Sequence, residues 1–143
     1  MEIQTEAQRE LLCLTVSGKV DVNACLRIMV KALDEAAEKR VYKILVNALL
    51  MTGTLTMTDR YDLGVGVASH IGNLGTNPKV AFVGAQPMWN GFGVTVAQNR
   101  GAVMEWFHTV QDARECSASG RPRPDDLAVN PFAKSGPKSR SPN

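Results

Sequence analysis

The chain has 143 residues, of which 44% are hydrophobic, and a formal net charge of +2. This length favours a single domain with a substantial core. A charge this small is not suited to wrapping nucleic acid, so we expect no nucleic-acid partner. No apolar run approaches the roughly 18–20 residues of a membrane span, so we expect none. Basic residues gather in residues 117–143, which hold five Lys/Arg against two Asp/Glu.

The cysteines are Cys13, Cys25 and Cys116, an odd number with no CxxC spacing. No apolar leader segment stands near Met1. Together these features predict a protein of the reducing cytoplasm. Cys13 and Cys25 fall on apolar patterns, so we expect them to be buried as small hydrophobic residues.

The first forty residues predict two strands and a helix. Residues 1–5 and 11–18 are extended in pattern and separated by polar residues, which favours a hairpin with its first strand at a sheet edge. Asp21 is a good N-cap for the following helix, because its carboxylate can accept from free N–H groups of the first turn. That helix should end near Lys39 and Arg40. Its apolar stripe is predicted to consist of Leu26, Met29, Val30, Leu33 and Ala37.

Residues 41–72 form the predicted centre of the fold. Residues 41–50 are almost continuously apolar, which is typical of a central strand covered by helices on both faces. Thr56 and Asp59 then have the spacing of a capping box. The next helix should bury Tyr61, Val65, Ala68 and Ile71, and stop at Gly72, Asn73 and Gly75. We expect its Gly64 and Gly66 to pack closely on the sheet.

The remaining pattern alternates strands and helices. Strands are predicted at 79–84 and 102–107, a short helix between them with Phe92, Val96 and Asn99 on one face, and a final helix from Thr109 to about Glu115. The order β-β-α-β-α-β-α-β-α predicts an α/β fold, with a mainly parallel sheet of about five strands and an antiparallel edge strand. We expect a domain over residues 1–116. Residues 117–143, rich in Pro, Ser and basic residues, are predicted to be a disordered tail.

Several phrases resemble the SpoIIAA-like superfamily, which joins STAS domains with CRAL-TRIO domains. They are LTVSGKVD, KILVNALLMTGTLTMTDRYDLG, KVAFVG and VAQNRGAVMEWFHTVQDARE, and they cover roughly residues 10–116 in the family's order. The nearer likeness is to small, poorly characterised bacterial STAS-like proteins. The resemblance implies a SpoIIAA-like fold and a regulatory, non-enzymatic role.

Two departures from the family pattern bear on function. Anti-sigma antagonists carry an Asp-Ser-Ser/Thr-Gly turn with a phosphorylated hydroxyl after the central strand, whereas this chain reads LMTGTLT. The phospho-switch is therefore not carried over. Small relatives usually have an acidic residue on the strand where this chain has Asn47.

A candidate ligand- or partner-binding site lies in two loops, residues 51–58 and 85–90. Both follow parallel strands, and ligands of open α/β sheets bind beyond the carboxyl ends of such strands. The alternative is that the threonines only cap and turn the chain, and that Trp89 only covers the end of the core. The candidate residues are Thr54, Thr56, Thr58, Asp59, Arg60, Gln86, Trp89 and Asn90.

We find no catalytic residues, cofactor motif or metal-ligand spacing. His70 and His108 lack an HExxH context, and both are expected to be surface or hydrogen-bonded histidines. The two GxG stretches, at 64–66 and 91–93, lack the remaining parts of a dinucleotide fingerprint. Trp106 alternates with Met104 and is predicted to be part of the core.

Our first functional hypothesis is a cytoplasmic, non-enzymatic STAS-like module that works through contacts with a protein partner. The alternative is a small-molecule or lipid-binding domain of the CRAL-TRIO type, with a small apolar ligand. This alternative needs an apolar cavity of several hundred Å3. A homodimer, through the edge strand or an apolar helix face, is left open.

Overall fold

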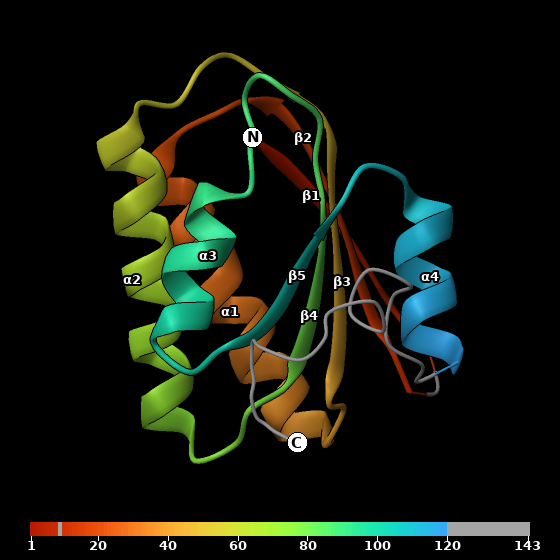
Figure 1. The fold of residues 1–143 in the computed structure, drawn as a ribbon. Coiled ribbons are helices and arrows are strands. Elements are labelled where there is room, and N and C mark those ends of the chain that lie inside the picture. The colour runs from red at the N-terminus through yellow and green to blue at the C-terminus, as the bar shows by residue number, and fades with distance from the viewer. Residues whose placement is uncertain (9, 120–143) are drawn as a thin grey trace, which may run out of the picture. The chain divides into compact units, whose positions relative to one another are not determined.

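The computed structural model describes residues 1–8 and 10–119 (Figure 1). The chain divides into two units, Met1–Ala113 and Arg114–Asn143, and the account below concerns the first. Helix α4 (Val110–Ser119) ends beyond Glu115, where the sequence predicted its end. The predicted disordered tail lies, from residue 120 onward, outside the described residues.

Five strands form one sheet in the order β1-β2-β3-β4-β5 (Figure 1). Strand β1 pairs antiparallel with β2, and all other neighbours are parallel. The predicted α/β class, the antiparallel edge strand and the central position of β3 are thereby confirmed. The strands are β1 (Glu2–Ala7), β2 (Leu12–Lys19), β3 (Lys43–Thr52), β4 (Lys79–Val83) and β5 (Val103–Phe107).

Helices α1 (Val22–Lys39), α2 (Met57–Leu74) and α3 (Phe92–Asn99) lie on the same side of the sheet (Figure 1). The Asp21 side chain caps α1 as predicted, accepting from the N–H groups of Asn23 and Ala24 at 3.0 and 3.2 Å. The core between these helices and the sheet contains Leu33 and Ile44, both 0% exposed.

The helices present somewhat different faces to the core from those predicted. In α1, Met29 and Leu33 are buried as expected, but the other predicted stripe positions are partly exposed and their neighbours Cys25, Ile28, Ala32 and Ala36 are buried. In α2, the predicted Tyr61 is 43% exposed, Val65 is only half-buried, and the helix continues through Gly72 to Leu74. In α3, Val96 is buried as predicted, but Phe92 and Asn99 are not, and Val94 and Ala97 are.

A one-residue bulge near the end of β3 gives Asn47 a structural role. Thr15 pairs with Asn47 but Ser17 pairs with Leu50, so β3 has one residue more than β2 over this interval. The Asn47 side chain accepts a hydrogen bond from the N–H of Leu49 at 3.0 Å. In the irregular interval, the neighbouring side chains Leu49 and Leu50 are both exposed, which breaks the inward–outward alternation of the strand.

Gly64 and Gly66 of α2 serve helix–helix packing, and the prediction that they pack on the sheet is wrong. A Cβ added to Gly64 would lie 2.5 Å from the carbonyl oxygen of Gly93 and 2.9 Å from Cβ of Val96 in α3. One added to Gly66 would lie 2.7 Å from Cδ1 of Leu26 in α1. Only a residue without a side chain lets α2 and α3 approach this closely.

Replacing Gly64 by Ala should therefore destabilise the protein by about 1–3 kcal/mol through overpacking. Gly72, in the same helix, is the matched control, because an added Cβ there meets nothing within 4 Å. Gly72→Ala should stabilise by roughly 0.5–1 kcal/mol, since Ala is the better helix former. Urea unfolding measures both values, and equal effects of the two substitutions would contradict the close crossing of α2 and α3.

Cys25 gives a second prediction about stability. Its side chain is 8% exposed, as predicted for a small hydrophobic residue, and its Sγ lies 4.0 Å from Sδ of Met1. Burial, with a smaller contribution from the Asp21 carboxylate, raises the pKa of the Cys25 thiol from 9.0 to about 11. The folded protein thus keeps this proton at a pH where the unfolded chain releases it, so stability falls as the pH rises from 9.0 toward 11.

Between about pH 8 and about pH 10, the wild-type protein should lose roughly 1 kcal/mol more stability than the Cys25→Ala variant, which has no such proton to release. Urea unfolding of both proteins at the two pH values measures this difference. Parallel losses in the two proteins would show that the thiol ionises equally easily in the folded and unfolded states.

Candidate functional site

The two predicted loops lie at the same edge of the sheet. One connects β3 to α2 and the other connects β4 to α3, and β3 and β4 are adjacent parallel strands. Both loops therefore leave the sheet at the same edge, although β3 continues to Thr52, past Asn47, which pairs with the last residue of β4, Val83. The contact between the two segments is made by Arg60 of α2, which donates to the Met88 and Pro87 carbonyls of the second loop.

The start of α2 uses two of the predicted site residues as a cap. The Thr56 hydroxyl accepts from the N–H of Asp59, and the Asp59 carboxylate accepts from the N–H of Thr56, both at 3.0 Å. The predicted capping box is confirmed. These polar groups hold the first turn of the helix, as the alternative interpretation of the threonines expects, while Thr54 and Thr58 are exposed.

Arg60 binds the second loop to α2. Its Nε donates to the carbonyl of Met88 and one terminal nitrogen donates to the carbonyl of Pro87, both at 2.9 Å. The peptide bond between Gln86 and Pro87 is cis. The guanidinium group of Arg60 is therefore used to position the loop, so an anionic ligand would compete with two loop carbonyls for it.

Trp89 packs inward from this loop. Its ring meets that of Phe82 in an edge-to-face contact, with centroids 4.7 Å apart. It also covers Gly84, where an added Cβ would lie 2.5 Å from the indole. Its Nε1 is buried and has no hydrogen-bond partner within the described residues. Trp89 thus covers the end of the core, which is one of the two roles predicted for it.

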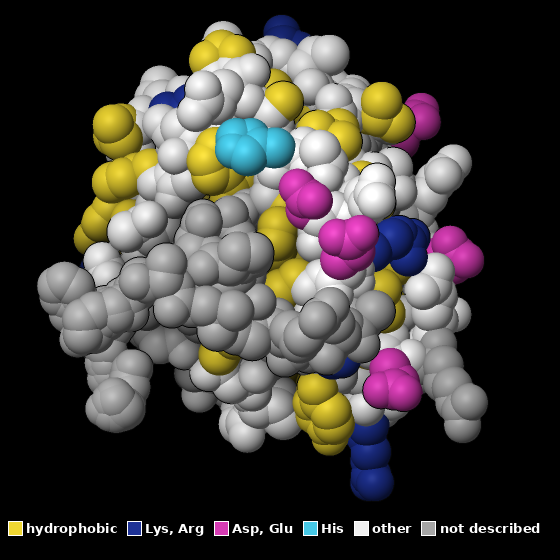
Figure 2. Space-filling view, turned by 45° about the vertical axis from the view of Figure 1, so that its right-hand side comes forward, with side chains coloured by type: hydrophobic (Ala, Val, Ile, Leu, Met, Phe, Trp, Pro, Cys, Tyr) yellow, Lys and Arg dark blue, Asp and Glu magenta, His cyan; other side chains and the backbone are white. Residues whose placement is uncertain are grey.

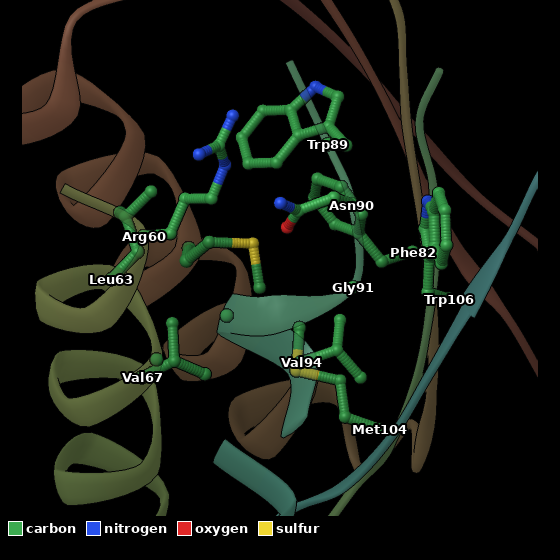
Figure 3. A pocket seen from close by; sticks show the side chains of 13 residues that line it. Arg60, Leu63, Val67, Phe82, Trp89, Asn90, Gly91, Val94, Met104 and Trp106 are labelled. Atoms are coloured by element: carbon green, nitrogen blue, oxygen red, sulfur yellow. The ribbon is translucent and has the colours of Figure 1, made fainter. Parts of the chain in front are cut away.

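Side chains from α1, α2, α3, β4, β5 and the second loop converge around a pocket (Figure 3). The lining is almost entirely apolar, and the cavity volume is about 70 Å3. Pockets that hold drug-sized ligands usually measure about 300–1,000 Å3. The pocket is lined by Met29, Arg60, Leu63, Gly64, Val67, Phe82, Trp89, Asn90, Gly91, Gly93, Val94, Met104 and Trp106.

Three of the eight predicted site residues line this pocket, namely Arg60, Trp89 and Asn90. The three threonines, Asp59 and exposed Gln86 do not. Asn90 accepts from the N–H of Phe92 at 3.1 Å and so helps to begin α3. The sequence analysis missed the contributions of β4 and β5.

Trp106 shows which feature of the sequence could have pointed to the contribution of β5. It alternates with Met104 on one face of β5, and both line the pocket. Trp106 donates from Nε1 to the carbonyl of Gly84 at 3.0 Å and packs against the core, as predicted. The cavity beside β5 exists because of the way α2 and α3 cross above the strand. The alternation of residues along β5 does not specify that crossing.

The histidines have structural surroundings. Nε2 of His70 lies 2.7 Å from the carboxylate of Asp34, joining α2 to α1. His108 lies beside the Trp106 ring, with centroids 4.5 Å apart. In residues 1–8 and 10–119, no group of three His, Cys, Asp or Glu side chains is arranged to hold a metal ion.

Two further observations describe the helices and the surface. None of the described helices combines the length and the hydropathy needed to cross a bilayer.

On the face drawn in Figure 2, acidic, basic and apolar side chains are interspersed among the coloured residues.

The Arg60 contacts make a testable prediction. Arg60→Ala removes two charge-assisted hydrogen bonds and should cost about 1–3 kcal/mol of stability. The Trp89 N–H, which donates to Ala85 at 3.0 Å, should exchange with solvent at least about tenfold faster. Arg60→Lys should not restore the loop, because an ammonium group cannot reproduce the guanidinium fork.

Arg100→Ala is the matched control for Arg60→Ala. Arg100 donates to the Tyr61 hydroxyl at 3.1 Å on the exposed side of α2. Its loss should change stability by less than about 0.5 kcal/mol and leave Trp89 exchange unaltered. If both arginine variants behave alike, Arg60 does not hold the loop. Urea unfolding and amide hydrogen exchange provide the measurements.

Comparison with known proteins reveals likeness at the level of structure. No protein-family model matches the chain, and no curated protein matches it. An anti-sigma factor antagonist from Mycobacterium paratuberculosis is similar with a TM-score of 0.57 and 12% identity, over 80% of this chain and 92% of that one.

Two other solved structures are similar at lower scores. The Bacillus cell fate determinant SpoIIAA in its phosphorylated form has a TM-score of 0.46 and 16% identity, over 81% of this chain and 99% of its own. An uncharacterised protein with a SpoIIAA-like fold from Shewanella loihica has a TM-score of 0.47 and 16% identity, over 80% and 90%. The five-stranded mixed sheet and its helices agree with the fold expected from the sequence resemblance. The chain therefore has the α/β fold of the anti-sigma factor antagonist from Mycobacterium paratuberculosis.

Proposed function

We propose that this chain is a non-enzymatic regulatory module that acts by binding a protein partner through the connection between β3 and α2. The observation that carries the proposal is a concentration of exposed apolar side chains there. Leu50 is 61% exposed and Met57 is 57% exposed, and Leu49 and Tyr61 lie nearby in the chain and are also exposed. Apolar side chains left in water provide the main driving force for protein association.

The connection is well suited to binding because its backbone is already fixed. Val20 donates its N–H to the carbonyl of Thr52 at 2.8 Å, and the capping box fixes the first turn of α2. Gly53 takes a φ of 107°, which other residues rarely adopt, and thereby makes the turn between strand and helix. A preformed surface loses little conformational entropy when it binds.

The fold supports a regulatory role. The antagonist from Mycobacterium paratuberculosis is named for an action on another protein, an anti-sigma factor. The proposal extends only the general mode, contact with a protein, to this chain. Phosphorylation is not part of it, because the turn after β3 has no Asp-Ser pair.

The volume of the pocket beside Trp89 favours a protein partner over a lipid at this end of the sheet. About 70 Å3 is far below the volume of ordinary ligand pockets, and Arg60 is already bonded to the loop that borders it. We place the protein in the cytoplasm, because Cys25 is a free thiol and an odd number of cysteines suits a reducing compartment.

The test is affinity capture from cells of the native host, followed by binding measurements with the purified partner. Leu50→Glu and Met57→Glu should each raise the dissociation constant at least about tenfold, which corresponds to about 1.4 kcal/mol. Both side chains are exposed, so the fold should remain intact, and circular dichroism checks this.

Tyr42→Glu is the matched control. Tyr42 is 56% exposed, but it precedes β3 and so lies at the opposite end of the strand from Leu50. Its replacement should leave binding unchanged. Normal binding by the Leu50 and Met57 variants would refute the surface. A stoichiometric small molecule retained in native mass spectrometry of the isolated protein would instead favour the ligand-binding alternative.

A further inference from the structure

Strand β1 is an edge strand with an unusual degree of exposure. All six of its residues are exposed, and it pairs with β2 on one side only. Within the described residues, no strand lies beyond it in the sheet. In an antiparallel pair, every second residue turns its N–H and C=O groups away from its neighbour. The outer side of β1 is therefore a template for one more strand.

A groove runs beside this edge, between β1 and α1. Its volume is about 320 Å3. This is several times the volume of the pocket beside Trp89, which lies on the same face of the sheet, over β4 and β5. Its apolar residues come from both walls and its rim carries one cation and one anion. It is lined by Met1, Ile3, Thr5, Leu14, Ile28, Lys31, Ala32 and Glu35. The groove can accept apolar side chains from a segment laid along β1.

The opposite face of β1 is acidic. Glu2 and Glu6 alternate with Ile3 and Thr5, so the carboxylates lie on the face away from the groove. Their cross-strand neighbours on β2 are Ser17 and Cys13, neither of which is a cation. Strand β1 contains no Lys or Arg.

These charges determine which occupant fits. A second copy of the chain would bring its own glutamates to the same edge, and like charges on paired strands repel. A segment with lysine or arginine at alternate positions would meet Glu2 and Glu6 on one face. Its intervening apolar side chains would then point toward the groove.

We propose that β1 binds an extended basic peptide segment of another protein, which joins the sheet as a sixth strand next to β1. Backbone hydrogen bonds along the edge supply affinity, while the groove and the carboxylates select alternating apolar and basic side chains. This surface is separate from the β3–α2 connection and does not depend on the role proposed for it.

The probe is a synthetic peptide of alternating lysine and valine, with the same length as β1, 6 residues. Binding is measured by fluorescence anisotropy with the full chain. Its dissociation constant should be at least about tenfold lower than that of a glutamate–valine peptide. The dissociation constant of the lysine–valine peptide should rise with salt concentration. A lysine–valine peptide with alternate backbone nitrogens methylated should bind at least about tenfold more weakly, because it cannot complete the ladder.

The double variant Glu2→Lys/Glu6→Lys should reverse the preference and select the glutamate–valine peptide. The matched control, Glu38→Lys/Asp62→Lys, makes the same change in net charge on exposed positions of α1 and α2 and should leave the preference unaltered. Hydrogen exchange should slow at β1 amides when the lysine–valine peptide binds.

Several results would overturn the proposal. The first is equal affinity for the lysine–valine and glutamate–valine peptides. The second is an affinity for the methylated lysine–valine peptide equal to that for the unmethylated one. The third is unchanged hydrogen exchange at the β1 amides when the lysine–valine peptide binds. Concentration-dependent protection of β1 without peptide, together with a dimer in light scattering, would assign the edge to a second copy instead.

Discussion

The side chains of Ile44, Leu45 and Val46 are at most 2% exposed, although successive residues of a strand face opposite sides of the sheet. Burial of β3 on both faces is the constraint on which the rest of the fold depends. It puts β3 in the middle of the parallel strands, with β2 and β4 as its neighbours. The loop that follows it therefore leaves the sheet at the same edge as the loop that follows β4. The strand order alone therefore determines where the candidate site lies, whichever side chains line it.

A second constraint acts above the sheet. Gly64 allows α2 to approach α3 at Gly93 and Val96, and this approach sets the dimensions of the apolar pocket below. Arg60, one turn earlier in α2, is then within reach of the Pro87 and Met88 carbonyls. The same helix therefore closes the pocket and holds the loop at its entrance. A small, well-packed pocket is the natural outcome of this geometry.

Local chemistry explains what the sequence predicts well. The N-cap at Asp21, the capping box of Thr56 and Asp59, and the continuous apolar run of β3 each depend on residues close together in the chain. The parallel direction of most strands follows from the alternation of strands and helices, whereas the full order of the strands in the sheet was not predicted.

Features that depend on distances between remote residues were predicted less well. The burial of Ala32 and Ala36 instead of Val30 and Ala37 reflects how α1 is rotated on the sheet. The carbonyls bound by Arg60 are 27 and 28 residues away in the chain, and no local pattern specifies such a pair. Likewise, the extra residue in β3 is visible only against its register with β2.

Gly84 has a consequence for how this protein can be studied. Trp89 packs over it and Trp106 donates to its carbonyl, and these are the only two tryptophans in the sequence. One indole N–H is hydrogen-bonded and the other has no partner within the described residues. The two tryptophans are the intrinsic fluorophores of the chain. Both lie at the end of β4, but their indole groups have different surroundings. Displacement of the loop alters the surroundings of both, so an optical signal of the state of the site is already part of the unlabelled chain.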